Sequence, residues 1–308
     1  MDHDTPEKRL AKILHAHGLT LNEVKACGGG CISGGYIVTT TEGEYFIKTN
    51  SSSFLRNFEA EKASLEALAS VGAMVCPSPL YCGVLDDDAY LLMTVLPHLS
   101  SACGKGEFGA KLAEFHIRGE RSERIFGFPT QTFCGATPLD NTETDDPWPR
   151  WFAKHRIGDI LQQIEKGTDK FLLERILPNG VCIADIEKAV EALLNIYAPD
   201  VRPSLLHGDL WGGNAGISNR RPCFFDPGCY YGDAEVDVAT TQLFGGFPSN
   251  LLTEYSKVRK LSPNYEEKEA LYNLYHILNH ALMFGGGYCS EARAMIKKIL
   301  EKARMQHK

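Results

Sequence analysis

The chain has 308 residues, of which 44% are hydrophobic and 23% are charged, and this balance is typical of a globular protein with one large core or two lobes. No apolar run is long enough to span a membrane, and the first residues lack the apolar segment of a secretory signal. A net charge of −7 argues against nucleic-acid and membrane partners, so we expect a cytoplasmic protein that binds neither.

The first third of the chain predicts a small domain of strands and helices. Apolar spacing and turn residues indicate, in chain order, a helix over 5–18, a glycine-rich loop at 28–30, strands over 36–41 and 44–49, a helix over 54–70 and a strand over 90–95. The turn between the two strands falls at Glu42-Gly43, and Gly72 ends the second helix.

The rest of the chain predicts a mostly helical domain. Helical periodicity covers 105–117, 149–165, 183–197, 233–245 and 265–284, and short strands flank the segment around residue 209. Pro97 ends the strand over 90–95, so we divide the chain into residues 1–96 and residues 97–308.

One segment carries the residue types that phosphoryl transfer requires. Asn214 follows Asp209 by five positions, as in the catalytic loop of protein kinases, and Asp226 follows 12 positions later. Asp209 can accept the proton of an attacking hydroxyl, whereas Asn214 and Asp226 offer oxygen ligands to Mg²⁺. His207 precedes this motif, and we interpret it as a structural brace of the loop rather than as a base.

A lysine and a glutamate upstream predict the nucleotide half of the site. Lys48 closes the strand over 44–49, where a kinase carries its phosphate-binding lysine. Phe58, Glu61 and Leu65 share one apolar face of the next helix, and a carboxylate on such a face needs a partner. We therefore predict a Lys48–Glu61 ion pair that orients Lys48 towards the phosphates of ATP.

Two backbone segments complete the predicted ATP site. The glycine-rich loop is neither a Walker A loop nor a dinucleotide fingerprint, and taken alone it indicates only a turn. Because it precedes Lys48, we expect it to approach the phosphates with Gly29, Gly30, Cys31 and Ser33. Met93, Thr94 and Val95 form the predicted hinge that contacts the adenine, unless this apolar run is only a buried strand.

The chain resembles the fructosamine kinases, also called ketosamine-3-kinases, which have a protein-kinase-like fold. The resemblance rests on Gly28–Ser33, residues 58–68, Leu205–Trp211, Asp226-Pro227, Tyr231-Gly232, Phe244–Pro248, Leu278–His280 and Phe284-Gly285. It implies an α+β fold of two lobes, with an antiparallel sheet and a helix in the N-terminal ATP-binding lobe and a mostly helical C-terminal lobe for catalysis and substrate.

The resemblance also implies a reaction. ATP, with Mg²⁺, would phosphorylate the 3-hydroxyl of fructosyl-lysine or ribulosyl-lysine adducts, either as free ketosamines or on glycated proteins. The product is unstable, so the reaction leads to protein deglycation. By matching position, Asp209 is the proton acceptor and Asn214 and Asp226 hold magnesium. Lys48, oriented by Glu61, positions the phosphates of ATP.

Aromatic residues offer two candidates for the acceptor side. Trp211 lies beside the predicted base and is either a wall for the sugar or a core residue. Trp148 begins the predicted helix over 149–165 and resembles an aromatic helix start that the family has on its substrate side. His276 and His280 lie one helical turn apart among core-like residues, so we interpret them as structural.

The ten cysteines form no C-x-x-C pair and predict reduced thiols. Cys31 is different, because loop amides and a lysine nearby would favour its thiolate. Its oxidation, by pairing with Cys31 of a second copy, would switch the enzyme off, and the chain would then be a monomer or a redox-dependent homodimer. The alternative is an unreactive loop cysteine.

Two other functions stay open at this point. Another small-molecule kinase, of the aminoglycoside or choline kinase type, would share the same catalytic residues and differ only in its acceptor pocket. A nucleotide-binding pseudokinase is the third possibility. It is disfavoured because the chain has all five expected catalytic and binding residues, Lys48, Glu61, Asp209, Asn214 and Asp226.

Overall fold

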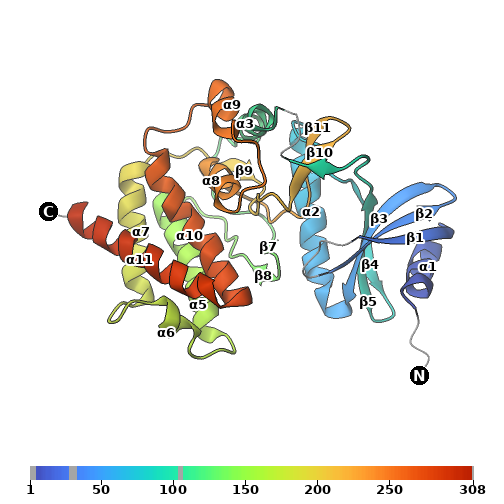
Figure 1. The fold of residues 1–308 in the computed structure, drawn as a ribbon, viewed down its shortest axis with the longest axis horizontal. Coiled ribbons are helices and arrows are strands. Elements are labelled where there is room, and N and C mark those ends of the chain that lie inside the picture. The colour runs from blue at the N-terminus through green and yellow to red at the C-terminus, as the bar shows by residue number, and fades with distance from the viewer. Residues whose placement is uncertain (1–4, 28–32, 103–106, 307–308) are drawn as a thin grey trace.

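The computed structural model describes residues 5–27, 33–102 and 107–306, which form a small sheet-containing lobe and a larger helical lobe (Figure 1). The structure therefore has the predicted α+β, two-lobed organisation. The long helix α2 lies between the sheet of the small lobe and the strands of the large lobe (Figure 1). Helix α2 is therefore one of the elements through which the two lobes meet.

The small lobe is an antiparallel sheet of order β1-β2-β3-β5-β4. Its strands are β1 (Leu21–Cys27), β2 (Gly34–Thr40), β3 (Gly43–Ser51), β4 (Pro79–Leu85) and β5 (Asp88–Thr94). Helix α1 (Pro6–Ala16) shares a core with Ile47 and Leu92, whereas α2 (Leu55–Val71), preceded by a 3-10 turn (Ser52–Phe54), shares one with Leu91 and Met93. Successive side chains of β5 thus enter opposite cores, as strand geometry requires.

Two strands of this lobe were not predicted. β1 is largely exposed and has no period-two apolar pattern, and β4 is also mostly half-buried or exposed. As a result, the glycine-rich segment was expected to precede the first strand, but it joins β1 to β2 instead. The predicted helix stop is confirmed, because Gly72 has a left-handed φ of 73° at the end of α2.

The large lobe packs its helices around one apolar core. The helices are α3 (Phe108–Arg118), α4 (Trp148–Phe152), α5 (Asp159–Lys166), α6 (Leu172–Ile176), α7 (Ile183–Tyr197), α8 (Glu235–Leu243), α9 (Leu251–Val258), α10 (Tyr265–Phe284) and α11 (Gly287–Gln306). A π-helical turn over Ala153–Gly158 interrupts the single helix predicted over 149–165. α6, α9 and α11 were not predicted, although α11 buries Cys289, Ala292, Ile296, Ile299 and Ala303 at helical spacing.

Short antiparallel strand pairs hold the candidate site. β9 (Ser204–Leu206) pairs with β12 (Tyr230–Gly232), and β10 (Ala215–Ser218) pairs with β11 (Arg221–Phe224) and with β6 (Ser100–Ser101). A further pair joins β7 (Phe133–Cys134) to β8 (Thr137–Pro138). The motif of residues 207–214 runs from β9 to β10, and Asp226 lies between β11 and β12. These pairings bring segments that are separate in sequence to one place.

Backbone hydrogen bonds tie the connection after α2 to the large lobe. The Val75 amide donates to the Pro222 carbonyl at 3.0 Å, and the Phe224 amide donates to the Val75 carbonyl at 2.8 Å. Within α2, the Ser64 hydroxyl accepts from the Cys229 amide at 3.4 Å. α2 and the connection after it are therefore fixed to the segments that flank Asp226.

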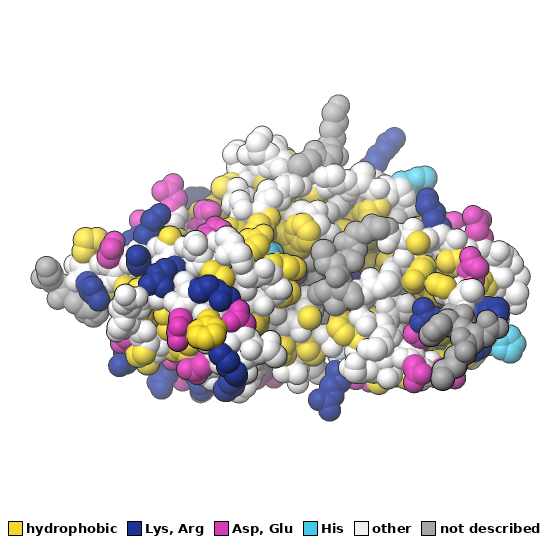
Figure 2. Space-filling view, turned by 60° about the horizontal axis from the view of Figure 1, so that its bottom comes forward, with side chains coloured by type: hydrophobic (Ala, Val, Ile, Leu, Met, Phe, Trp, Pro, Cys, Tyr) yellow, Lys and Arg dark blue, Asp and Glu magenta, His cyan; other side chains and the backbone are white. Residues whose placement is uncertain are grey.

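On the face shown in Figure 2, apolar side chains gather near the middle of the molecule, and most charged side chains lie towards its two ends. In the described parts of the chain, no helix is both long and apolar enough to cross a bilayer.

Candidate active site

A buried aspartate of α8 anchors the backbone that leads to Asp209. The carboxylate of Asp237 accepts from the amide of His207 at 2.7 Å and from that of Gly208 at 3.0 Å. Burial alone would raise the pKa of Asp237, but His116 and the loop amides hold it below its usual value. The ionised Asp237 thus fixes the chain directly before Asp209.

His207 links this loop to the segment that carries Asp226. Its Nε2 donates to the carbonyl of Phe225 at 3.0 Å, so its Nδ1 is free to accept from the amide of Asp209 at 3.3 Å. Burial lowers the pKa of His207, which keeps the ring neutral. His207 is therefore a brace between two loops, as the sequence predicts.

Gly208 allows a close approach that no other residue permits. Its φ is 81°, and a Cβ at this position would overlap the carbonyl oxygen of Gly228. The Gly228 amide in turn donates to the His207 carbonyl at 2.9 Å. The two loops are therefore in direct backbone contact beside Asp209.

Asp209 and Asn214 contact each other across the loop. Nδ2 of Asn214 donates to the backbone oxygen and to Oδ2 of Asp209, both at 3.0 Å. Burial raises the pKa of Asp209 to about 7, while hydrogen bonds from Cys134 and Asn214 oppose the increase. An aspartate with a pKa near neutrality has the basicity that proton acceptance from a hydroxyl requires.

Asp226 occupies a strained backbone position. Its φ is 56°, in the left-handed region that residues other than glycine seldom adopt, although aspartate tolerates it better than most. The amide of the preceding Phe225 donates to the Asn214 carbonyl at 3.0 Å, which draws the two predicted metal ligands together. Oδ1 of Asp226 lies 2.5 Å from Nζ of Lys48.

The predicted Lys48–Glu61 ion pair is present, with Nζ and Oε1 2.6 Å apart. Lys48 comes from β3 and Glu61 from α2, and both side chains are largely buried. Burial by itself lowers the pKa of Lys48, but Glu61 and Asp226 raise it above the usual value for lysine. Lys48 is therefore a permanent cation between two carboxylates, one from each lobe.

The other residues predicted to bind ATP are only partly described. Ser33 accepts a hydrogen bond from Asn50 at 3.1 Å, and the Thr94 hydroxyl accepts from the Ser78 amide at 2.8 Å. The side chain of Met93 is buried in the core beneath α2, its backbone lies between β3 and β4 in the sheet, and Val95 is half-buried. Gly29, Gly30 and Cys31 lie outside the described residues.

The two candidate tryptophans differ in environment. Trp211 is 39% exposed beside Asp209, and its ring lies against Gly213. Trp148 is 1% exposed, its Nε1 donates to the hydroxyl of Tyr272 at 3.0 Å, and its ring stacks on Trp151. The prediction that Trp148 contacts substrate is therefore contradicted, because packing in the helical core leaves its indole no free surface.

Sequence reasoning missed three residues around the site. Asp237 and His116 support the loop, and Cys134 approaches Asp209 from β7. A buried acid between Val236 and Val238 was a usable indication for Asp237, because a carboxylate within an apolar helix needs partners. His116 and Cys134 had no such pattern.

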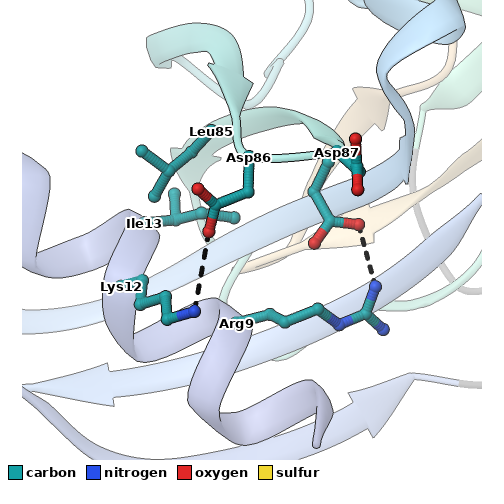
Figure 3. A pocket seen from close by; sticks show the side chains of 7 residues that line it. Arg9, Lys12, Ile13, Leu85, Asp86 and Asp87 are labelled. Carbon is teal, nitrogen blue, oxygen red and sulfur yellow. Dashed lines mark hydrogen bonds and ion pairs between the residues drawn. The ribbon is translucent and has the colours of Figure 1, made fainter. Parts of the chain in front are cut away.

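A surface pocket on the outer side of the small lobe is separate from this site. It lies between α1 and the turn from β4 to β5 (Figure 3). Both cations of the pocket are paired, Arg9 with Asp88 at 2.8 Å and Lys12 with Asp86 at 3.5 Å (Figure 3). We assign no ligand to it.

Comparison with known sequences gives matches over nearly the whole chain. A family model described as fructosamine kinase matches residues 5–302. A probable ketoamine kinase of Vibrio parahaemolyticus is 37% identical over 283 residues, which cover 91% of this chain and 93% of that protein. The ketosamine-3-kinase of Mus musculus is 34% identical over 91% of this chain and 97% of its own length.

Solved structures also match nearly the whole chain, and they show its fold. A putative fructosamine-3-kinase of Haemophilus somnus superposes with a TM-score of 0.81 at 25% identity, over 94% of this chain and 96% of that one. An aminoglycoside phosphotransferase superposes with a TM-score of 0.62 at 15% identity, over 96% of this chain and 97% of that one. At this identity the second match concerns the fold alone, which is protein-kinase-like.

Proposed function

The chain belongs to the fructosamine kinase family and is a phosphotransferase that acts on a hydroxyl group, and we propose that it transfers the γ-phosphate of ATP to the 3-hydroxyl of ketosamines. The single observation that carries this proposal is Lys48, which lies 2.6 Å from Glu61 and 2.5 Å from Asp226. A fixed cation beside a candidate metal ligand, with a base of raised pKa nearby, is the arrangement that phosphoryl transfer requires.

Lys48 would neutralise the α- and β-phosphates of ATP, and Glu61 would hold its ammonium in place. The loop residues Gly29, Gly30, Cys31 and Ser33 would cover the phosphates. The backbone at Met93, Thr94 and Val95 would contact the adenine. In this proposal, residues 1–96 form the ATP-binding lobe, and residues 97–308 form the lobe for catalysis and substrate binding.

The donor atoms of Asn214 and Asp226 fit magnesium. Because Nδ2 of Asn214 is engaged by Asp209, the amide oxygen is the atom left for a cation. Asp226 adds a carboxylate, and Mg²⁺ prefers such hard oxygen ligands. When bound, Mg²⁺ would neutralise the charge of the phosphates.

Asp209 would orient and deprotonate the acceptor. The 3-hydroxyl oxygen forms a bond to the γ-phosphorus, the bond from that phosphorus to the bridging oxygen of ADP breaks, and the hydroxyl proton passes to Asp209. Asn214 donates to Oδ2 of Asp209 at 3.0 Å and so fixes the carboxylate for this transfer. Asp237 holds the loop behind it.

Trp211 is the residue that we propose to contact the acceptor. Its exposed indole beside Asp209 offers an apolar face for a sugar ring. We propose that fructosyl-lysine or ribulosyl-lysine adducts bind here, free or on glycated proteins, and that decomposition of the phosphorylated product releases the amine. The alternatives are an aminoglycoside- or choline-type acceptor and a pseudokinase, and the intact set of five residues argues against the latter.

A panel of acceptors tests this proposal. The full chain is incubated with labelled ATP and Mg²⁺ and with fructosyl-lysine, ribulosyl-lysine, choline or an aminoglycoside. We expect label transfer to one or both ketosamines and none to the other two. Transfer to choline or the aminoglycoside in preference to both ketosamines would overturn the acceptor assignment, and no transfer to any acceptor would favour the pseudokinase.

A further inference from the structure

Three potential metal ligands lie together at the proposed base, Asp209, and two of them, Cys134 and His276, have no role in the proposed reaction. The sulfur of Cys134, a carboxylate oxygen of Asp209 and a ring nitrogen of His276 all lie within 4.8 Å of one another. They come from β7, from the loop after β9 and from α10. Cys134 and His276 are buried, whereas Asp209 retains some exposure. The sequence suggested only a structural role for His276, because core-like residues surround it along the chain and no third ligand was evident.

The hydrogen bonds of His276 fix which ring nitrogen has a lone pair. The hydroxyl of Thr240 donates its one proton to the Val236 carbonyl at 2.9 Å, so its oxygen must accept from Nε2 of His276 at 3.0 Å. In this tautomer the ring proton is on Nε2, so Nδ1 has an unshared lone pair. Nδ1 is buried, has no hydrogen-bond partner, and lies 3.9 Å from Oδ1 of Asp209.

A lone pair that faces a carboxylate at this distance is electrostatically unfavourable unless a cation lies between them. The distance is too long for a direct hydrogen bond even if Asp209 carries a proton. The third group, Cys134, has its sulfur oriented by a further amide. Asn279 donates to Sγ at 3.2 Å, and the Thr137 hydroxyl donates to Oδ1 of Asn279 at 2.5 Å. Such outer partners are typical of metal ligands, because they fix the direction of the donor atoms.

We propose that Cys134, Asp209 and His276 form a binding site for a thiophilic divalent cation such as Zn²⁺, and that an ion bound here inhibits the enzyme by occupying its base. Zinc accepts sulfur, nitrogen and carboxylate oxygen donors in tetrahedral geometry, and a solvent molecule can take the fourth position. Ligand atoms around zinc are separated by about 3.5 Å, so the three side chains need to close by only about an ångström.

The charges balance at this site. Zn²⁺ displaces the proton of the Cys134 thiol to solvent and then bonds a thiolate, a carboxylate and a neutral imidazole, so the cluster has no net charge. The metal stays divalent throughout. Magnesium is not expected to compete well, because it prefers oxygen donors over sulfur. The inhibition rests on the proposed role of Asp209 as the base, whereas the binding of zinc does not.

Metal binding by the full chain, in the absence of nucleotide, is the direct test. Zn²⁺ alone is titrated calorimetrically in two buffers of different ionisation enthalpy, and Co²⁺ is used as a spectroscopic substitute. We expect one tight Zn²⁺ per chain, release of a proton, and a thiolate-to-cobalt charge-transfer band. Cys134→Ser keeps a hydrogen-bonding group but removes the soft ligand, and it should lose the band and weaken Zn²⁺ binding by more than about 100-fold.

Two further variants separate this site from adventitious binding. His276→Gln should also abolish tight binding, whereas Cys182→Ser, at an exposed cysteine on the start of α7, should bind like the parent chain. Circular dichroism and a thermal melt establish that each variant is folded. If Cys134 variants prove unfolded, Thr240→Val tests the site without changing a ligand, and it should weaken binding by about 10–100-fold through loss of the fixed tautomer.

The site is refuted if the parent chain gives no thiolate-to-cobalt band, or if Cys134→Ser and Cys182→Ser bind Zn²⁺ equally well. Kinase assays in excess Mg²⁺ then test inhibition, which we expect in the parent chain and not in His276→Gln. Zinc binding in a chain that phosphorylates no ketosamine would leave the metal site intact and reject the proposed function. If the chain phosphorylates ketosamines but binds zinc equally well without Cys134 or His276, the proposed function stands and the metal site is rejected.

Discussion

Nζ of Lys48 lies 2.5 Å from Oδ1 of Asp226, although 178 positions separate the two residues in the chain. One belongs to the sheet of the small lobe and the other to the loop between β11 and β12 of the large lobe. Glu61 holds the other side of the same ammonium at 2.6 Å. The proposed phosphate-binding and metal-binding groups therefore meet at one cation.

Lys48→Met should lower kcat by about 10²- to 10³-fold, because it removes a fixed positive charge where the phosphates gain charge during transfer. It should also leave Glu61 buried without a partner and so lower the free energy of unfolding. Labelled-ATP assays and urea unfolding measure the two effects. Lys62→Met, on the exposed face of the same helix α2, is the matched control. Equal activities of the two variants would remove Lys48 from the site.

Asp209→Asn should reduce turnover by about 10²- to 10⁴-fold while nucleotide binding is retained, since the variant lacks a proton acceptor but keeps Lys48 and Asp226. Turnover is measured with labelled ATP, and nucleotide binding by calorimetry. Full activity of this variant would contradict the assignment of the base.

The raised pKa of Asp209 also predicts a pH dependence of activity. Only the ionised carboxylate accepts a proton, so kcat/KM of the free enzyme should rise with pH and level off above a pKa of about 7. A profile that is flat between pH 5 and 8, measured with an acceptor that does not titrate there, would contradict this assignment.

The raised pKa of Asp209 makes activity increase with pH, but it makes the stability of the folded chain decrease with pH. The folded pKa of Asp209 lies above its unfolded value of 3.8, so the unfolded chain loses this proton first and stability falls as the pH rises from about 4 to about 7. Asp209→Asn avoids this loss and should be more stable than the parent chain above pH 7, by roughly 2 kcal/mol or more. Urea unfolding should show a small difference between the two chains at pH 5 and a larger one at pH 8.

Two glycines offer a matched test of the close approach at the catalytic loop. Gly208 and Gly18 have similar φ values, 81° and 75°, but a Cβ at Gly208 would overlap Gly228, whereas a Cβ at Gly18 would meet nothing within 4 Å. Gly18→Ala should cost about 1 kcal/mol of stability from backbone strain alone. Gly208→Ala should cost more and also abolish activity. Similar losses in both variants would show that strain, and not the loop contact, matters at Gly208.

Asp237→Ala should remove the acceptor of two buried amides and destabilise the chain by about 3–5 kcal/mol, with a parallel loss of kcat. Its pKa lies below the unfolded value, so the stability that Asp237 supplies is present above the unfolded pKa and is lost as the pH falls through the folded one. Unfolding curves at several pH values check this trend. Asp200→Ala, at an exposed aspartate, should change neither quantity.

Local sequence patterns determined much of this protein. The offset between Asp209 and Asn214 predicted the catalytic loop, and the apolar face of α2 identified Glu61 as the partner of Lys48, because a buried carboxylate on a helix requires a nearby cation. Most of the long helices followed from their 3.6-residue periodicity, since packing against one core imposes that spacing. The exposed strand β1 escaped detection because it buries too little to leave an alternating pattern.

Only the tertiary structure decided which distant groups meet. Trp148 entered the core instead of the substrate side, because helix packing encloses its indole on every face. Asp237 and His116 came to support the loop, and Cys134 with His276 came to Asp209, through contacts between residues that lie from about 30 to about 120 positions apart. Such contacts depend on how helices and strands assemble in three dimensions, and spacing along the chain contains no record of them.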